Sequence, residues 1–558
     1  MWNSSKPWTR RDFLRTSSTA ALFAALPAHF GKHSDAGVHV FTPDEIARAE
    51  TLAQPADVAV VRDLAMRAID AARSAGATYA DARVTRHVTQ TYLGVGFYWD
   101  SETLGIGVRA LVDGAWGFSA SPYWELDEAA QLARDAVAQA SVNARNGVHK
   151  TVDLGKYPVA SGSWSTPLRI DPLQISIEEK QDFGVSFVGL VPTRLHNREI
   201  SAGMDGMGFV REERAIATTD GSYFTQTLHQ SGGGFTVTVR DTDPRHTDGR
   251  RVSVSGRGIS AAGAGWERLL DAKLREQIPG LIAEAEELLT ARRKPVEIGR
   301  YDLVCDATTI ARLIDGTLGM ASELDRALGY EANASGTSYL GPDPFQQLGR
   351  TLASSLLNVT GDRSLPMGLA TVKWDDEGVE PEKYAIVANG VFNDYSTTRE
   401  QAAWLAPWYQ KQNRAVRSHG CAAASSALAI SQSTTPNIVM QPGTEKVGFD
   451  ELVAGTKTGL AVVGGDLTMD FQSRSGAGGG TIREIVDGKI GAVIEGAGYL
   501  FDSTQLWKNL RAIGGPQSME TIPASELKGE PAQRPLHTTS AVPGILKDMP
   551  VVDMRRKA

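Results

Sequence analysis

The sequence lacks long apolar runs, an excess of basic charge and more than a trace of cysteine. No stretch reaches the ~18 consecutive apolar residues that a membrane-spanning helix needs, so we expect no membrane span. The 57 Lys and Arg residues are outnumbered by 65 Asp and Glu residues, and the net charge of -8 argues against nucleic acid as a partner. Two cysteines, Cys305 and Cys421, exclude a disulfide framework; we expect two buried thiols, and whether they pair stays open.

The patterns that are present predict an α+β protein of more than one domain. The chain has 558 residues, 57 of them glycine, which favours many turns and β-structure. Helical apolar spacing over 42–75 and 124–146 is followed by strand-like hairpins, the first turning at Asp113-Gly114 and the last at Asp487-Gly488. We therefore predict a mixed α/β N-terminal domain at 40–294, a strand-rich, barrel-like C-terminal domain at 295–545 and a tail at 546–558.

Four local patterns refine this prediction. The Ser- and Pro-rich segment 161–172 is expected to be a loop. Pro279-Gly280 is expected to kink or divide a long helix. A helix is expected over about 307–328, after a short strand that ends at Cys305. From Gln517 onward, proline, serine and charged residues predict irregular structure.

The first 35 residues resemble an export signal. Arg10 and Arg11 precede a short alanine-rich apolar run from Thr19 to Pro27, as in twin-arginine leaders. An accidental Arg-Arg pair before an apolar stretch is the alternative. The export reading predicts a periplasmic or other extracytoplasmic protein, and the sequence leaves the cleavage site open.

The most informative stretch is Asp315–Asn333, which reads DGTLGMASELDRALGYEAN. Its second part resembles the signature A-L-E-G-D-R-x-L-G-Y-E-A-N of the TldD/PmbA family of metallopeptidases. In that family the stretch opens H-E-x-x-G-H. This chain has Asp315 and Met320 at the two histidine positions and Gly316 at the position of the general-base glutamate. The resemblance covers most of the chain, from Tyr79 to about Pro543.

The resemblance implies a zinc site whose chemistry this sequence has lost. A zinc peptidase needs three protein ligands and a base, but Met320 is a poor zinc ligand and Gly316 has no side chain to accept a proton. The family's third ligand is a cysteine in a stretch like C-G-K-G-Q-P. Its counterpart here, ELKGEP, has Glu526 at that position. We therefore expect no catalytic residues, no cofactor and no zinc, although zinc belongs to intact family members.

Two further expectations concern this site. Positions five apart on an α-helix point ~140° apart, so the helix is expected to distort or end near the retained Gly319. Asp315 and Glu526 are weak candidates for a hard-cation site, with His537 as the histidine nearest in sequence to the lost cysteine position; two solvated acids are the plain alternative. His419, two residues before Cys421, offers too few ligands for a site, and His29 and His33 lie in the leader.

The retained residues are candidates for contact with a peptide, and structural roles in the scaffold are the alternative. Helix-surface pairing and a helix C-cap at Gly329 would explain several of them without any ligand. The candidates for a peptide-binding groove are Glu323, Asp325, Tyr330, Glu331, Asn333, Gly336, Thr337 and Ser338.

Three functions are consistent with these patterns. The resemblance implies a hollow two-subunit assembly in which peptides or unfolded proteins bind as an added β-strand. The first hypothesis is a metal-free, non-catalytic or weakly active subunit, in a homodimer or in a heterodimer with a motif-bearing relative. The second is an active peptidase with a rearranged metal site, and the third is a stand-alone peptide-binding module.

Overall fold

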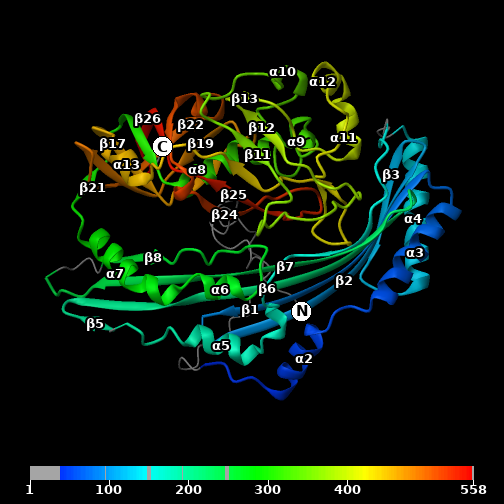
Figure 1. Cartoon of the computed structure of the whole chain (residues 1–558), viewed down its shortest axis with the longest axis horizontal. Coiled ribbons are helices and arrows are strands. Elements are labelled where there is room, and N and C mark those ends of the chain that lie inside the picture. Colours follow the sequence, from blue (N-terminus) through cyan, green and yellow to red (C-terminus); the bar gives the residue numbers. More distant parts are fainter. Residues whose placement is uncertain (1–37, 95, 148–152, 192, 246–249, 556–558) are drawn as a thin grey trace, which may run out of the picture. The chain divides into compact units, whose positions relative to one another are not determined.

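Long antiparallel strands build the N-terminal half. The computed structural model describes residues 38–94, 96–147, 153–191, 193–245 and 250–555, and the expected leader with Arg10 and Arg11 lies outside these residues. One eight-stranded sheet has the order β3-β2-β1-β6-β7-β4, with β5 paired to β6 and β8 paired to β7 (Figure 1). Its strands are β1 (Tyr79–Leu93), β2 (Phe97–Val112), β3 (Ala115–Ser121), β4 (Ser161–Ser165), β5 (Arg194–Leu195), β6 (Arg198–Thr218), β7 (Tyr223–Asp241) and β8 (Arg251–Ser255).

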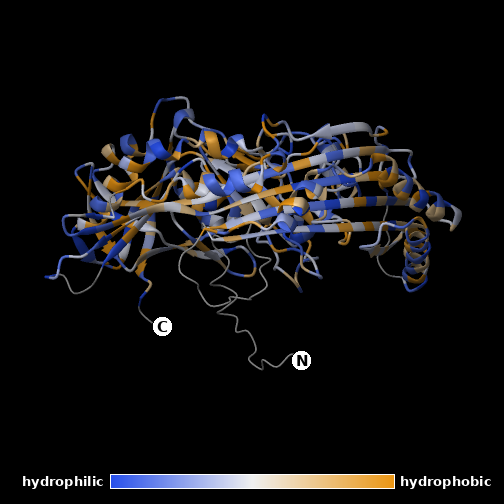
Figure 2. Ribbon diagram, turned by 90° about the horizontal axis from the view of Figure 1, so that it is seen from below, coloured by the Kyte–Doolittle hydropathy of each residue, from blue (hydrophilic) through white to orange (hydrophobic). Residues whose placement is uncertain are grey.

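Helices cover one face of this sheet. Along β1, apolar residues such as Ala82 and Val84 alternate with polar ones such as Asp81 and Arg83, and this alternation is visible along the long strands (Figure 2). The apolar face packs against helices that carry alanine-rich stripes. The helices are α2 (Pro43–Ala53), α3 (Val58–Ser74), α4 (Leu126–Arg145), α5 (Ile177–Val185), α6 (Glu267–Asp271) and α7 (Leu274–Thr290).

The C-terminal half contains three further sheets. A ten-stranded sheet follows the path β18-β19-β22-β26-β10-β17-β20-β21-β9 with β23 on β26, a six-stranded sheet has the order β13-β12-β11-β16-β25-β24, and β14 pairs with β15. Helix α8 (Ala307–Ile314) shares one core with residues of both large sheets.

The C-terminal strands are β9 (Arg293–Pro295), β10 (Gly299–Cys305), β11 (Val359–Gly361), β12 (Tyr384–Ala388), β13 (Val391–Phe392), β14 (Ala422–Ala423), β15 (Gln432–Ser433), β16 (Ile438–Met440), β17 (Thr458–Val463), β18 (Leu467–Met469), β19 (Ser475–Gly478), β20 (Thr481–Val486), β21 (Lys489–Glu495), β22 (Ala497–Asp502), β23 (Leu510–Ile513), β24 (Glu520–Ser525), β25 (Leu536–Ala541) and β26 (Gly544–Asp553). The other helices are α9 (Leu324–Ala327), α10 (Pro344–Gln347), α11 (Arg399–Trp404), α12 (Ala406–Lys411), α13 (Phe449–Ala454) and α14 (Ser503–Leu506).

The predicted α+β class is confirmed, with a mixed N-terminal half and a strand-rich C-terminal half. Both predicted hairpins are present, and their turns hold Asp113 and Asp487 at φ +48°. The predicted helix over 42–75 is two helices, because Pro55 lies between them and Asp57 caps the second. The exact domain limits stay a prediction.

Three local predictions are wrong. Segment 161–172 contains β4, an edge strand whose polar residues pair in parallel with β7. Helix α7 is not divided at Pro279 and continues to Thr290, with Ile278 and Leu281 buried on either side of the proline; a kink at that point stays a prediction. The chain after Gln517 is not irregular: β24, β25 and β26 belong to the two large sheets, and β26 runs on to Asp553, through most of the expected tail at 546–558.

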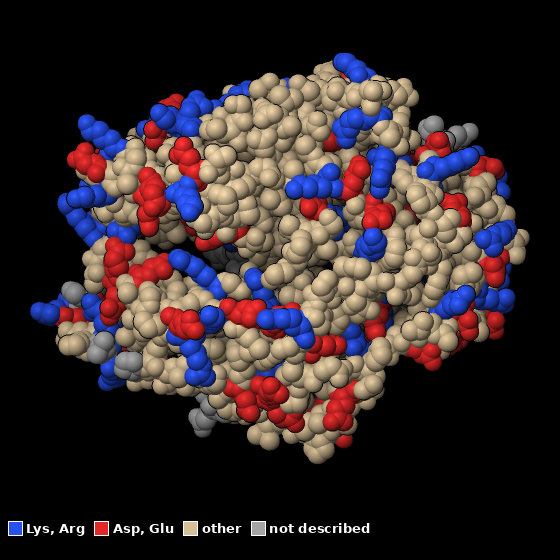
Figure 3. Space-filling model, viewed as in Figure 1, with Lys and Arg blue, Asp and Glu red and all other residues tan. Residues whose placement is uncertain are grey.

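Within the described ranges, no helix is both long enough and apolar enough to cross a bilayer. On the face of the molecule in Figure 3, acidic and basic side chains are interspersed.

Candidate functional site

The stretch Asp315–Asn333 is not one helix. Helix α8 ends at Ile314 and continues as a π-helical turn η2 (Asp315–Gly319) and a 3-10 turn η3 (Met320–Ser322), before Glu323 becomes extended. In the π turn, the N–H of Met320 donates to the carbonyl of Asp315. This i to i+5 bond brings positions five apart close together on one side of the helix. The expected distortion is thus confirmed, and the backbone would suit two side chains acting jointly at 315 and 320.

Asp315 forms an ion pair with His537 of β25. Its Oδ1 lies 2.6 Å from His537 Nε2 and accepts a hydrogen bond of 3.3 Å from Thr539 Oγ1. The Asp315 side chain is 19% exposed, and that of His537 is 1% exposed. Burial lowers the pKa of His537, but the carboxylates of Asp315, Glu526 and Glu323 together outweigh burial, so the pKa is raised. The sequence offered both residues as weak metal candidates, and the structure pairs them with each other.

Gly316, at the position of the family's general base, is packed against β18. A Cβ built on Gly316 would lie 2.7 Å from Leu467 Cδ2 and 3.6 Å from Met469 Cγ. A Cβ on Gly319 would lie 2.6 Å from Ile438 Cδ1. These contacts are below or near the van der Waals limit, so apolar side chains fill the space that a side chain at 316 would need.

Glu526 lies beside Glu323 in the interior. Thr435 Oγ1 is 3.1 Å from Glu323 Oε1 and 3.3 Å from Glu526 Oε2, and the Thr435 N–H donates to Glu526 Oε1 at 3.2 Å. Burial, and next the charge of Glu526, raise the pKa of Glu323 from its ordinary 4.5 to about 7. The two carboxyl groups therefore resist carrying two negative charges together.

Two buried cations neutralise this acidic cluster. Lys528 Nζ donates to Glu323 Oε2 at 2.7 Å and to Asp325 Oδ1 at 2.8 Å, and its side chain is fully buried. Arg326 Nε donates to Glu323 Oε2 at 3.2 Å, and its Nη2 lies 3.6 Å from Glu526 Oε2. Burial alone would lower the pKa of Lys528, but the carboxylates of Asp325, Glu323 and Glu526 raise it. Lysine and arginine thus bind the carboxylates from within the fold.

The remaining peptide-groove candidates divide into buried and exposed residues. Glu331 accepts hydrogen bonds from Gly529 N and Ser335 Oγ, and Ser338 Oγ donates to Ala321 O at 2.6 Å. Like Glu323 and Asp325, both are buried in the scaffold.

The other four candidates lie after α9. Tyr330 is 54% exposed and stacks with Trp404 at 5.9 Å between ring centroids. Asn333 is exposed. Thr337 N donates to Phe471 O at 2.8 Å, and a Cβ on Gly336 would lie 2.3 Å from the same oxygen. Tyr330 and Asn333 are therefore the candidates with side chains most open to a ligand.

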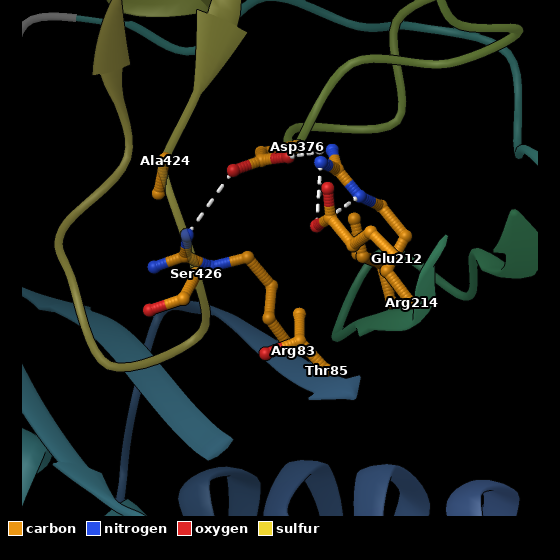
Figure 4. A pocket seen from close by; sticks show the side chains of 8 residues that line it. Arg83, Thr85, Glu212, Arg214, Asp376, Ala424 and Ser426 are labelled. Carbon is orange, nitrogen blue, oxygen red and sulfur yellow. Dashed lines mark hydrogen bonds and ion pairs between the residues drawn. The ribbon is translucent and has the colours of Figure 1, made fainter. Parts of the chain in front are cut away.

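A second polar cluster joins the two halves of the chain on the polar face of the eight-stranded sheet. Asp376 accepts hydrogen bonds of 3.1 Å from Arg83 of β1 and from Arg214 of β6, and Arg214 also binds Glu212 (Figure 4). These residues line a cavity of about 10 Å³, room for about one water molecule. The neighbouring Glu377 binds Arg109 of β2 at 3.0 Å. Ion pairs thus fasten the loop 375–377 to three strands.

Two glycines of β2 allow a second segment of the C-terminal half, residues 427–429, to pack closely against the polar face of the eight-stranded sheet. A Cβ on Gly107 would lie 1.9 Å from Ala427 O, and one on Gly105 would lie 3.0 Å from Leu428 Cγ. Ala427 N donates to Thr85 Oγ1 at 3.0 Å, and Arg83 donates to Ala429 O at 2.7 Å. The sheet therefore binds the backbone of 427–429 directly.

His419 and the two cysteines lie outside the motif region. His419 is 1% exposed and lies between Glu382 Oε1, at 3.0 Å, and Asp394 Oδ2, at 3.1 Å. Cys305 and Cys421 are both buried, as expected, and they are not bonded to each other. Burial raises the pKa of the Cys421 thiol to about 12.

The residues at the three family ligand positions do not fit zinc. The Asp315 carboxylate pairs with His537, and Met320 offers only a thioether. The Glu526 carboxylate accepts a hydrogen bond from the Thr435 N–H and lies next to Arg326. Over the ranges that the structure describes, no three His, Cys, Asp or Glu side chains are grouped to hold a metal ion. The donor set of this site differs from that of a zinc centre, and the expectation of no cofactor stays a prediction.

Sequence reasoning missed several residues of this site. Lys528, Thr435 and Leu467 were not among the candidates, although Lys528 stood in the quoted ELKGEP stretch. A lysine two residues from an expected acidic ligand was an available signal for charge compensation. Thr435 and Leu467 are far from the motif in sequence and gave no signal of their own.

The chain is similar to known proteins over most of its length. Residues 298–549 match the PmbA/TldA metallopeptidase C-terminal domain, and residues 95–140 match the PmbA/TldA metallopeptidase domain 1. A metalloprotease of Methanocaldococcus jannaschii is 22% identical over 361 residues, covering 64% of this chain and 71% of that protein.

Solved structures share the fold. A protein of Bacteroides thetaiotaomicron described as a modulator of DNA gyrase has a TM-score of 0.62 at 16% identity, over 88% of this chain and 98% of that one. TldE of Thermococcus kodakarensis has a TM-score of 0.58 at 14% identity, over 87% and 98% of the two chains.

Proposed function

This chain belongs to the TldD/PmbA family of metallopeptidases, and we propose that it is a metal-free, non-catalytic or weakly active subunit of an exported peptidase complex. In this role it binds peptide and completes the cavity, while a motif-bearing relative supplies the zinc chemistry. The observation that carries the proposal is the packing of Leu467 and Met469 against Gly316. Gly316 has no side chain that could act as a general base, and the side chains of Leu467 and Met469 lie where one would extend.

Two of the other altered positions support the same proposal. Asp315 is paired with a buried histidine, and Glu526 lies in a cluster with Lys528 and Arg326. Both of these residues have protein partners of their own, as expected of a site that is maintained for structure. A relative with the related fold is named TldE, which is consistent with a two-subunit assembly.

Peptide binding is the activity proposed for the chain itself. Tyr330 and Asn333 are the side chains that we assign to peptide contact, because they are exposed beside the buried Glu323–Ser338 scaffold. Replacement of both by alanine is expected to weaken the binding of an unstructured peptide without lowering the melting temperature. Exposed Phe345 replaced by alanine is the matched control.

Hydrolysis assays test the proposal. The purified chain alone is expected to leave an unstructured peptide intact, and mixing with a motif-bearing family member is expected to give a stable complex that hydrolyses it. Hydrolysis by the chain alone that is restored by Mn²⁺ or Ca²⁺ after chelation would favour the rearranged-metal enzyme. A monomer that binds peptide and no relative would favour the stand-alone module.

Export is the second part of the proposal. Its support is the Arg10-Arg11 pair before an alanine-rich run. Replacement of Arg10 and Arg11 by lysine is expected to retain the precursor inside the cell, as cell fractionation would show. Unchanged export of that variant would contradict the proposal on location and leave the proposal on peptide binding untouched.

A further inference from the structure

Two helices and a turn cover part of the apolar face of the eight-stranded sheet. This cover consists of α2, η1 (Pro172–Gln174) and α5, which lie beside β1 and β6 (Figure 1). Leu52 and Leu173 of the cover form one buried cluster with Val88 of β1. Arg211 of β6 donates to three carbonyl oxygens at the end of α2, at 2.7, 2.8 and 2.9 Å. Apolar packing and bonds to backbone carbonyls therefore hold the cover on the sheet.

Lys180 of α5 lies under this cover without an acidic partner. Its side chain is fully buried, and its Nζ donates to Gln90 Oε1 of β1. The ring of Phe209 on β6 lies 5.0 Å from Nζ. Among the residues that the structure describes, Asp171 and Glu179 are the charged groups that act on Lys180, and neither forms a hydrogen bond or an ion pair with it. Because a buried ammonium without a carboxylate partner is costly, these surroundings favour the neutral amine.

His229 of β7 is a second buried base that faces Asp171. Its side chain is 5% exposed, and its Nδ1 lies 3.9 Å from Asp171 Oδ1, too far for a hydrogen bond. The other charged groups that act on His229 are Arg211, Glu213 and Glu267. Burial is the largest influence and lowers the pKa of His229. Asp171 therefore acts on both bases and is bonded to neither.

Opening of the cover would change the protonation of both bases. Burial lowers the pKa of Lys180 from its ordinary 10.5 to about 7, and contact with water would restore the ordinary value. Opening then takes up a proton, so it becomes easier as the pH falls from about 10 to about 7, and Lys180 adds nothing more below that. For His229 the same sign holds, with the effect beginning as the pH falls below its ordinary pKa of 6.5.

We propose that Lys180 and His229 make the cover a pH-sensitive element, which is closed at alkaline pH and opens increasingly as the pH falls. Opening exposes apolar residues of the sheet to solvent, among them Val88 and Phe209. The inference is independent of the proposed function, because it involves no residue of the altered motif.

Hydrogen exchange of the full chain tests the proposal, with each rate corrected for the intrinsic exchange rate at its pH. In the unaltered chain, the protection of the α5 amides is expected to fall about tenfold per pH unit between about pH 9 and about pH 7. Lys180→Met keeps the length of the side chain and removes its charge, so the protection of α5 is expected to stay constant over this range. Lys457→Met, at an exposed position, is the matched control and should behave as the unaltered chain does. His229→Gln should retain the change above pH 7 and lose only the further fall below about pH 6.5.

Each outcome supports or overturns the proposal. A fall in protection that Lys180→Met abolishes and Lys457→Met retains would support it. Equal protection of α5 at the two pH values in the unaltered chain would overturn it, whether or not the variants fold. A fall that persists in Lys180→Met would overturn it as well, and Lys180→Gln gives the same comparison if Lys180→Met does not fold.

Discussion

Asp315 and His537 are 2.6 Å apart and join the end of α8 to β25 at the position where the family has its first histidine ligand. The pair is largely buried, with 19% of the Asp315 side chain and 1% of the His537 side chain exposed. The residue at the family's first zinc-ligand position, Asp315, therefore uses its carboxylate to bind another protein side chain.

The Asp315→Ala substitution is therefore expected to destabilise the fold. Alanine at position 315 would leave the buried His537 without its carboxylate partner. Leaving a buried polar group unpaired costs about 1–3 kcal/mol, which urea unfolding would measure. The Asp315→Asn variant, which keeps an oxygen acceptor, is expected to lose less. Equal stability of all three proteins would contradict the importance of this pair.

A glutamate restored at position 316 is expected to disrupt packing without restoring catalysis. Because a Cβ at position 316 would lie 2.7 Å from Leu467 Cδ2, Gly316→Glu forces the Leu467 side chain to move, at a cost of about 1–3 kcal/mol. Adding Leu467→Ala should recover part of this loss. Gly280→Glu, on an exposed helical position with open space around it, is the matched control and should be nearly neutral. Peptide hydrolysis by Gly316→Glu alone would contradict our reading of the site.

The Glu323–Glu526 pair predicts a loss of stability with rising pH. The pKa of Glu323 in the folded protein is raised to about 7 from an ordinary value of 4.5, so the folded state holds a proton that the unfolded state releases earlier. Its contribution is fully present below about pH 4.5 and falls as the pH rises toward 7, by on the order of 1 kcal/mol per pH unit.

Glu526→Gln tests this pH dependence, because it removes the neighbouring charge while an amide oxygen can still accept from Thr435. The variant is expected to lose less stability between pH 5 and 8 than the unaltered chain in urea unfolding. Burial keeps part of the shift, so the slope should be reduced and not abolished. Identical slopes for the two proteins would show that the two carboxyl groups do not interact.

Gly107→Ala is expected to loosen the contact between the two halves of the chain. Its Cβ would lie 1.9 Å from the carbonyl oxygen of Ala427, whose own N–H donates to Thr85 Oγ1 and ties this backbone to the sheet. We expect a loss of at least ~2 kcal/mol in unfolding free energy. Gly203→Ala, on β6 with nothing within 4 Å, should change stability by less than about 0.5 kcal/mol. Similar effects of the two substitutions would argue against a tight contact at 427.

The sequence predicts local elements well where the pattern is regular. Period-two alternation and Asp-Gly turns identify the hairpins at 113 and 487, and the five-residue spacing from 315 to 320 correctly predicts a distorted helix. The pattern fails at edge strands such as β4, where solvent on one side removes the apolar alternation.

Long-range contacts account for what the sequence does not predict at the site. The importance of Lys528 depends on Glu323, 205 residues away, and the closure of Gly316 depends on Leu467 in another strand. The role of loop 375–377 depends likewise on arginines of three distant strands. Composition and residue spacing describe one segment of the chain at a time. Each of these contacts joins two segments that are far apart in the sequence, so neither segment alone predicts it.

The metal content of the mature protein tests the central claim most directly. The chain is to be purified without chelators and without a histidine tag, and its metal measured by mass spectrometry. We predict well below one zinc, manganese or calcium ion per chain, because Asp315 and Glu526 are bound by protein partners and Met320 offers only a thioether. One firmly bound ion per chain would contradict the account and identify the chain as a metalloenzyme whose ligands have moved.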